Sequence, residues 1–411
     1  MSADISHINS PIVIYVVHHP DCESAHRLSR MLFRWFRLGD LIGDTAAAGL
    51  PVYYRRQLHN DQIHLAINWD SADLNVVILL ADHLMIGDSE WRKAVFELEE
   101  KANRRREQTD QADGESAPQV LLLPVALHES FYRAGPLYQH FNPVRLLDMT
   151  EQERQATLRR AATEATARAL RARQVPSAHP PLNIFLSHAK RDGTQIAEQL
   201  RDGVRRFGQL VAWYDANDLP YGMQWESPMK QAVKQGTAAM VATVTDAYPS
   251  RPWCRLEANL ARTPESVDND PWVWGVQPVV AVHQPGEGWV RSMPILEGVP
   301  RIGWDGRHPD EDTARVVDRL VLEVLLTQAH QLVAQELAAK LKTPGLCFIT
   351  WVPDTWTLIM LRDKLGDRRS DVKRIIYPGH GLRTVEIAEL KAALRTFGQD
   401  VGLATYEEVW P

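Results

Sequence analysis

The sequence predicts an α/β protein with parallel sheets, divided into three segments. In each segment, short runs rich in β-branched residues alternate with stretches typical of helices. Two breaks separate the segments: a proline-rich stretch at 174–181, and the Pro344–Gly345 pair that follows a long helical stretch. The length of 411 residues agrees with this division, because it allows about two to four domains of ordinary size.

Composition and charge narrow the class of protein. Hydrophobic residues make up 45% of the chain and charged residues 24%, which is typical of a globular protein and excludes a fibrous or wholly disordered one. The formal net charge of −6 gives no sign of a nucleic-acid-binding surface. We therefore expect no nucleic-acid partner.

Cysteine usage and hydropathy predict the compartment. Three cysteines lie far apart, which argues against a disulfide framework and favours a reducing cytoplasm. The first residues have no basic segment followed by an apolar one, so no secretory signal is visible. Apolar runs stay well below the roughly 18 residues of a membrane helix. A soluble, cytoplasmic protein with no membrane partner is expected.

The first segment, 1–149, is expected to form one α/β domain. Its strand candidates are Pro11–Val17, Leu74–Leu80 and Val120–Leu127. The stretch Thr150–Arg173 is rich in Ala, Arg, Glu and Leu and predicts a long amphipathic helix, which with the proline-rich linker fills 150–180.

The rest of the chain is expected to form a second domain at 181–310, a connecting helix at 311–342 and a small α/β module at 343–411. The second domain has strand candidates at Asn183–Ser187, Ala238–Thr245 and Val276–Val282, and the connecting helix is predicted over Asp312–Leu341. The small module has no ligand signature, and its expected elements are strands at 346–352, 372–377 and 402–405 and a helix at 386–397.

Segments one and two share an order of features that predicts a tandem duplication. In each, a strand ends at a histidine, His18 or His188, and a buried-looking strand later leads into a helix that begins near a tryptophan. The distance from Ile14 to Trp91 is 77 residues, and from Ile184 to Trp253 it is 69. The two spacings therefore agree to within one loop.

Three motifs in segment two carry the most specific signal. A strand ends in Ser187-His188, a loop runs from Asp215 to Gly222 after the next strand, and Ser250-x-x-Trp-Cys-x-x-Glu257 follows the third. Together they resemble the TIR domain (Toll/interleukin-1 receptor) in its bacterial enzymatic form. The resemblance covers about 181–306 and implies a flavodoxin-like sheet of parallel strands flanked by helices.

The resemblance also implies cleavage of NAD at the bond between nicotinamide and ribose. Glu257 matches the family's catalytic glutamate, and a single carboxylate can stabilise the oxocarbenium-like ribose because the leaving group is already cationic. The motif residues all follow strand ends, where open parallel sheets bind ligands. NAD is expected as substrate, with no metal and no cofactor. The other residues expected at the substrate pocket are Ser187, Asp215, Trp225, Ser250 and Trp253.

Simpler roles are expected for several neighbours. His188 follows Ser187 on a strand, so the two side chains point to opposite faces and do not form a nucleophile–base pair. Asp192 is placed to cap the next helix, and Cys254 is expected to be a small buried hydrophobe. Trp225 fits a core position as well as a wall of the pocket.

Segment one departs from the enzymatic pattern. Its tryptophan helix begins with Asp88-Ser-Glu-Trp91, but Val95 stands in the place of Glu257, with Glu97, Glu99 and Glu100 nearby. The loop around 49–56 lacks the aspartate and the following glycine. We expect a TIR-like domain that keeps the fold, lacks the carboxylate and serves assembly or sensing.

Three functions follow from the resemblance. The first is an NAD glycohydrolase of antiphage defence, active on self-association and gated by the other domains in response to a ligand or protein trigger. The second is a cyclase that makes a cyclic ADP-ribose-type signal from the same cation. The third is a non-enzymatic adaptor, and the retention of Glu257 favours the enzymes.

Overall fold

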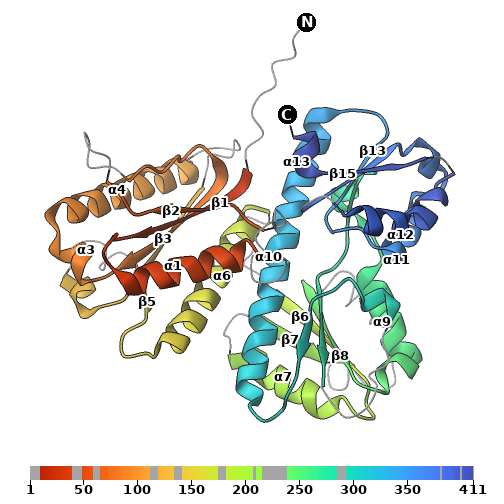
Figure 1. The fold of residues 1–411 in the computed structure, drawn as a ribbon, viewed down its shortest axis with the longest axis horizontal. Helices are drawn as coiled ribbons and strands as arrows, with labels where there is room; N and C mark the ends of the chain where they lie inside the picture. Colours follow the sequence, from red (N-terminus) through yellow and green to blue (C-terminus); the bar gives the residue numbers. More distant parts are fainter. Residues whose placement is uncertain are drawn as a thin grey trace, which may run out of the picture. The chain divides into compact units, whose positions relative to one another are not determined.

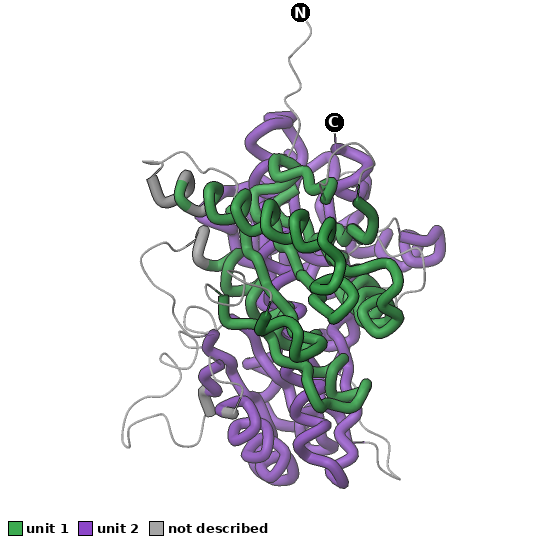
Figure 2. The backbone as a smooth tube through the Cα atoms, turned by 90° about the vertical axis from the view of Figure 1, so that its left-hand side faces the viewer, with its two compact units in different colours: residues 1–177, 411 green, residues 178–410 purple. Residues whose placement is uncertain are grey.

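The computed structural model describes residues 10–38, 49–58, 65–111, 119–133, 141–174, 182–206, 210–214, 238–284, 293–379, 382–398 and 400–410. The chain divides into two compact units, residues 1–177 and 178–410 (Figure 2). Strands and helices alternate in both units, which confirms the α/β class expected from the sequence. No helix in the described ranges combines the length and apolar character needed to cross a membrane.

The first unit is built on one parallel sheet with the order β2-β1-β3-β4-β5 (Figure 1). Strand β3 is buried along almost its whole length, which is expected because helices cover both faces of such a sheet. The helix expected over Thr150–Arg173 is observed as α6. The elements are β1 (Ser10–His18), α1 (Glu23–Phe36), β2 (Val52–Arg55), β3 (Ala72–Ala81), α3 (His83–Gly87), α4 (Ser89–Gln111), β4 (Gln119–Ala126), η1 (Glu129–Arg133), β5 (Val144–Arg145) and α6 (Glu151–Gln174).

The second unit contains two sheets, and the first has the order β12-β11-β8-β6-β7, again all parallel. Numbered along the chain, both this sheet and that of the first unit have the order 2-1-3-4-5, which is the flavodoxin-like order. The elements here are β6 (Leu182–His188), α7 (Thr194–Arg206), β7 (Leu210–Tyr214), β8 (Ala239–Val244), η3 (Tyr248–Ser250), α9 (Pro252–Arg262), β11 (Val279–His283), η5 (Pro294–Leu296) and β12 (Arg301–Gly303).

The other sheet of the second unit has the order β15-β14-β13-β10-β9. Its first three strands come from the C-terminal segment, whereas β9 and β10 come from the stretch between α9 and β11. The strand expected over Val276–Val282 is observed as β11, which begins three residues later, at Val279. Strand β10, which ends at Gly275 and belongs to the other sheet, was not expected from the sequence. The elements are β9 (Glu265–Ser266), η4 (Val267–Asn269), β10 (Val273–Gly275), β13 (Leu346–Ile349), α11 (Thr355–Leu365), η6 (Gly366–Asp371), β14 (Arg374–Tyr377), α12 (Thr384–Arg395), β15 (Gly402–Thr405) and α13 (Tyr406–Val409).

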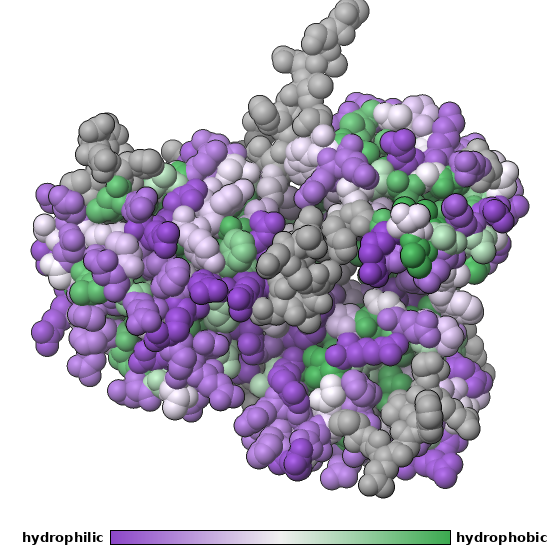
Figure 3. Space-filling model, in the orientation of Figure 1, coloured by the Kyte–Doolittle hydropathy of each residue, from purple (hydrophilic) through white to green (hydrophobic). Residues whose placement is uncertain are grey.

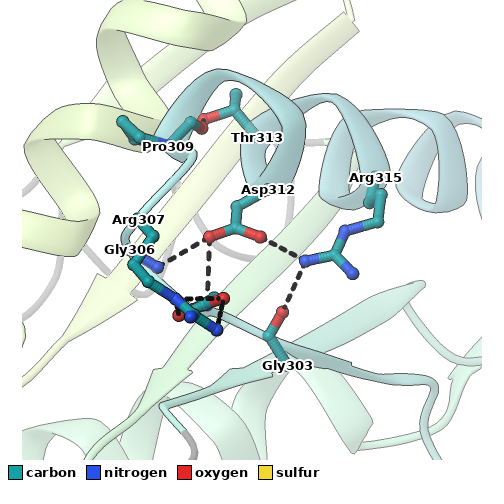
Figure 4. A network of polar contacts seen from close by, with 8 residues as sticks. Gly303, Gly306, Arg307, Pro309, Asp312, Thr313 and Arg315 are labelled. Carbon is teal, nitrogen blue, oxygen red and sulfur yellow. Dashed lines mark hydrogen bonds and ion pairs between the residues drawn. The ribbon is translucent and has the colours of Figure 1, made fainter.

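The long helix α10 (Pro309–Leu341) packs against both sheets of the second unit (Figure 1). A polar network fixes its first turn to the end of β12 (Figure 4). The Asp312 carboxylate accepts hydrogen bonds from the backbone amides of Asp305 (3.0 Å) and Gly306 (2.8 Å) and from the Arg315 guanidinium. Arg315 also donates to the carbonyl of Gly303 (3.1 Å). The helix thus satisfies backbone donors of the turn that leads into it.

Candidate active site

Strand β6 and helix α9 place a serine beside a glutamate at the carboxyl edge of the flavodoxin-like sheet of the second unit. The hydroxyl of Ser187, near the end of β6, donates a hydrogen bond to the carboxylate of Glu257 in the middle of α9. Both side chains are almost wholly buried, with 1% of Ser187 and 4% of Glu257 exposed. The contact joins two residues that the sequence motifs single out, at the edge where such sheets bind ligands.

A buried tyrosine supports this pair from the far side of the serine. The Tyr248 hydroxyl lies 2.7 Å from the Ser187 oxygen, and because Ser187 gives its only proton to Glu257, Tyr248 is the donor. Burial raises the pKa of Tyr248 well above its ordinary value, and the charge of Glu257 raises it further. Tyr248 therefore stays protonated, and the three groups form a chain of hydrogen bonds directed at the carboxylate.

Asp192 joins the loop after β6 to the loop after β8. Its carboxylate accepts hydrogen bonds from the Thr245 hydroxyl (2.6 Å) and from the backbone amide of Ala247 (2.9 Å). The expectation that Asp192 caps helix α7 is therefore wrong, because both carboxylate oxygens bond across the sheet edge. This link holds the turn that delivers Tyr248 to Ser187.

Four expected site residues remain, of which the structure describes two. Trp253 lies one helical turn before Glu257 and is half-buried, whereas Ser250 is exposed and bonds to the carbonyl of Ala247 (2.7 Å). Cys254 is buried, as expected, and donates from Sγ to the backbone carbonyl of His188 (3.4 Å). The other two, Asp215 and Trp225, lie outside the described residues.

Comparison with known proteins identifies this part of the chain. The family model described as "TIR domain" matches residues 184–294. Residues 184–294 form a TIR domain. The match confirms the fold class that the Ser187 and Glu257 motifs predicted for this part of the chain.

No curated protein matches the chain. One solved structure, described as the C-terminal domain of glucosamine-fructose-6-phosphate aminotransferase from Francisella tularensis, is similar over 78% of this chain and 84% of its own at 8% identity. Its TM-score is 0.19, which supports no conclusion about fold or function.

The C-terminal end of α9 in the TIR domain is bound by Asp354, the residue that caps helix α11. Helix α11 packs on the sheet that contains β13. The guanidinium of Arg262 forms an ion pair with Asp354 at 2.9 Å, and Asp354 also caps helix α11 through the amide of Thr357 (2.9 Å). Burial lowers the pKa of Arg262, and the facing Asp354 opposes that effect. Lys364 and Glu265 form a second, exposed pair at 3.3 Å. The C-terminal end of the helix that carries Glu257 is thus anchored to α11.

The described contacts indicate what chemistry suits the Ser187–Glu257 pair. No group of metal-ligating side chains with metal-binding geometry occurs among the described residues. Ser187 bonds to Glu257 and Tyr248, and His188 follows it on the strand and points to the other face. A buried carboxylate that a serine hydroxyl orients suits the stabilisation of positive charge on a substrate.

The first unit has apolar side chains at the corresponding positions. Val17 precedes His18 as Ser187 precedes His188, and Val95 follows Trp91 as Glu257 follows Trp253. Both valines are buried in one hydrophobic cluster, with 0% and 6% exposed. At this edge of the first unit, core packing replaces the serine–glutamate contact.

Two contacts of the site, those of Tyr248 and Asp354, could not be predicted from the sequence. Tyr248 lies 61 residues from Ser187, and the only local sign of its role was its place just before the tryptophan helix. Asp354 lies 92 residues from Arg262, in a segment without a recognised motif. Neither contact follows from local spacing.

Proposed function

We propose that the TIR domain cleaves NAD at the bond between nicotinamide and ribose, with Glu257 as its catalytic residue. The observation that supports this most is the buried contact between Ser187 and Glu257 at the carboxyl edge of the sheet. A glutamate held in that way is oriented before substrate arrives, so its charge does not have to reorganise during the reaction.

The bond cleavage itself needs little from the protein. The electron pair of the C–N bond leaves with the nicotinamide ring, whose positive charge it neutralises, so no acid has to protonate the leaving group. The ribose becomes oxocarbenium-like and positively charged. Glu257 stabilises that charge, and water then adds at the sugar carbon and loses a proton to give ADP-ribose.

The burial of Glu257 bears on regulation. With only 4% of the residue exposed, substrate reaches the carboxylate only after the surrounding chain rearranges. Self-association of TIR domains, gated by the rest of the chain, is the change that we propose. NAD depletion in antiphage defence is the biological role that we propose on the basis of the family resemblance, with the first unit acting in assembly or sensing.

The first experiment measures nicotinamide release from NAD by the full chain at high protein concentration. Wild type is compared with Glu257→Gln, which keeps the size of the side chain and removes its charge. Glu198→Gln, on the exposed side of α7, is the matched control. We expect loss of turnover in Glu257→Gln by at least 100-fold, about 2.7 kcal/mol of transition-state stabilisation, and wild-type turnover in the control.

Product analysis in the same assay separates the alternatives. Free ADP-ribose identifies hydrolysis, and a cyclic product identifies a cyclase that uses the same cation. Turnover that survives in Glu257→Gln contradicts the assignment of this residue. An assembled wild-type protein that leaves NAD unchanged contradicts both enzymatic proposals and favours an adaptor.

A further inference from the structure

The α1–β2 edge of the first unit carries a concentration of positive charge that the proposed reaction does not use. Arginines recur along α1 at 27, 30 and 34 and again at 37, just after the helix, and the strand segment Tyr53-Tyr54-Arg55-Arg56 adds two more. The one acidic residue of α1, Glu23, pairs with Arg27 (3.2 Å), and Glu151 of α6 also lies near Arg27 (3.7 Å), so the arginines from Arg30 onward carry the excess charge. Figure 3 shows strongly hydrophilic residues gathered over this helix. The local charge is thus opposite to the net charge of the chain, −6.

Aromatic packing brings three of these arginines together on one face of β2. Phe33 of α1 stacks on Tyr54 of β2, with ring centroids 5.3 Å apart. Arg30, Arg34 and Arg56 all lie close enough to the Tyr54 hydroxyl to act on it electrostatically. Neither Arg30 nor Arg56 has a carboxylate partner within the described part of the chain. An anion beside Tyr54 would therefore meet the guanidinium groups of Arg30 and Arg56, which no described carboxylate neutralises.

The opposite face of β2 repeats the combination of arginine and aromatic ring. The Arg55 guanidinium lies over the ring of Tyr15 (4.9 Å) and over that of Tyr53 (5.6 Å). Tyr53 is 48% exposed, an unusual fraction for a large aromatic side chain on a strand. Because β2 is the last strand of its sheet, a ligand can reach both of its faces around the edge.

We propose that the α1–β2 edge binds single-stranded nucleic acid, a partner that the net charge of the whole chain did not lead us to expect. From Arg30 to Arg37 the chain rises by about 10 Å, which is long enough for successive phosphates, and Arg56 lies near the same Tyr54 as Arg30 and Arg34. Aromatic rings beside guanidinium groups provide stacking platforms for unpaired bases, a feature that neither an acidic peptide nor a lipid headgroup needs. The acidic charge elsewhere on the chain confines binding to this edge.

The test measures binding of fluorescein-labelled single-stranded DNA and RNA of about 20 nucleotides to the full chain by fluorescence anisotropy at several salt concentrations. Arg30→Gln/Arg34→Gln/Arg56→Gln removes three phosphate contacts. We expect at least tenfold weaker binding and a logarithmic salt slope smaller by about 2. Tyr53→Ala tests stacking and is expected to weaken binding roughly fivefold or more without changing the salt slope.

Matched controls distinguish a specific site at the α1–β2 edge from general attraction between an oligonucleotide and exposed cations. Arg368→Gln/Arg369→Gln/Lys391→Gln removes three exposed cations from the second unit and is expected to leave binding unchanged. An equal loss in that control overturns the proposal, as does a wild-type protein that binds neither strand. Binding of anionic phosphatidylserine vesicles or of a poly-glutamate peptide, without binding of either oligonucleotide, also overturns it. None of these readouts involves NAD.

Discussion

Glu257 is held by a chain of two hydroxyl groups, and only part of that chain could be predicted. Ser187 and Glu257 belong to motifs with characteristic spacing, so the sequence identified both. Tyr248 stabilises them from a short turn after β8, where one tyrosine among many gives no local signal. Asp192 was misassigned for the same reason. Its position before α7 suggested a cap, whereas its partners lie more than 50 residues away.

Tyr248→Phe tests the hydrogen-bond chain that runs from Tyr248 through Ser187 to Glu257, because it removes a single oxygen atom. The change keeps the buried ring and removes the hydroxyl that donates to Ser187, so the serine oxygen loses its donor. We expect the free energy of unfolding to fall by about 1–2 kcal/mol and kcat for NAD to fall several-fold, with KM little changed.

Tyr377→Phe is the matched control for that variant. Its hydroxyl, at the end of β14 in the other sheet of the second unit, accepts a partly buried hydrogen bond from the amide of Leu382 (3.0 Å), so its loss removes one bond in a different sheet from Glu257. We expect a similar loss of stability with unchanged kcat. If both variants lower kcat equally, Tyr248 acts on overall stability and does not position the carboxylate.

At the scale of elements, helix α9 connects the proposed active site with the C-terminal segment, because it carries both Glu257 and Arg262. Its existence was predictable, because a tryptophan and a glutamate four residues later mark one face of a helix. Its anchoring was not. The Arg262–Asp354 pair depends on the docking of α11 against the end of α9, and long-range docking of that kind leaves no periodic pattern in the sequence.

Asp354→Ala tests the anchor. The variant leaves the guanidinium of Arg262 buried without its counter-charge and removes the cap of α11, so we expect a loss of about 3–5 kcal/mol in the free energy of unfolding. Glu265→Gln removes a charge from an exposed pair and is expected to cost less than about 1 kcal/mol. Denaturant titration measures both.

The double variant Arg262→Met/Asp354→Leu separates the charge from the packing. Removing both partners leaves no buried unpaired charge, so most of the stability lost in Asp354→Ala is expected to return. A double variant as unstable as the single one would show that the cap and the packing of α11 matter more than the ion pair.

At the scale of the whole molecule, the first unit forms one sheet from consecutive strands. In the second unit, one sheet combines strands from two separate stretches of the chain. The matching strand order 2-1-3-4-5 of two sheets agrees with the duplication that His18 and His188 suggested. In the second sheet of the second unit, β13, β14 and β15 were predicted. Strands β9 and β10 were not, because they have only two and three residues and lie far from their partners in sequence. Short strands of this kind are stabilised by pairing and burial and not by their own propensity.

The sheet that combines β9 and β10 with β13 to β15 predicts where the chain can be divided. A cut after residue 177 keeps each core whole, whereas a cut after residue 342 does not. Without residues 343–411, β10 loses the hydrogen bonds from Phe348 to Trp272 (2.7 Å) and from Thr350 to Trp274 (3.0 Å). The truncation also exposes Trp274 and Val276, which are buried in the cluster that contains Ile349. We expect a fragment of residues 178–342 to aggregate or to unfold without a cooperative transition. Fragments 1–177 and 178–411 each keep a complete core and are expected to unfold cooperatively, as followed by circular dichroism during heating. A stable, cooperative 178–342 fragment would mean that the TIR domain does not depend on the sheet that shares its residues.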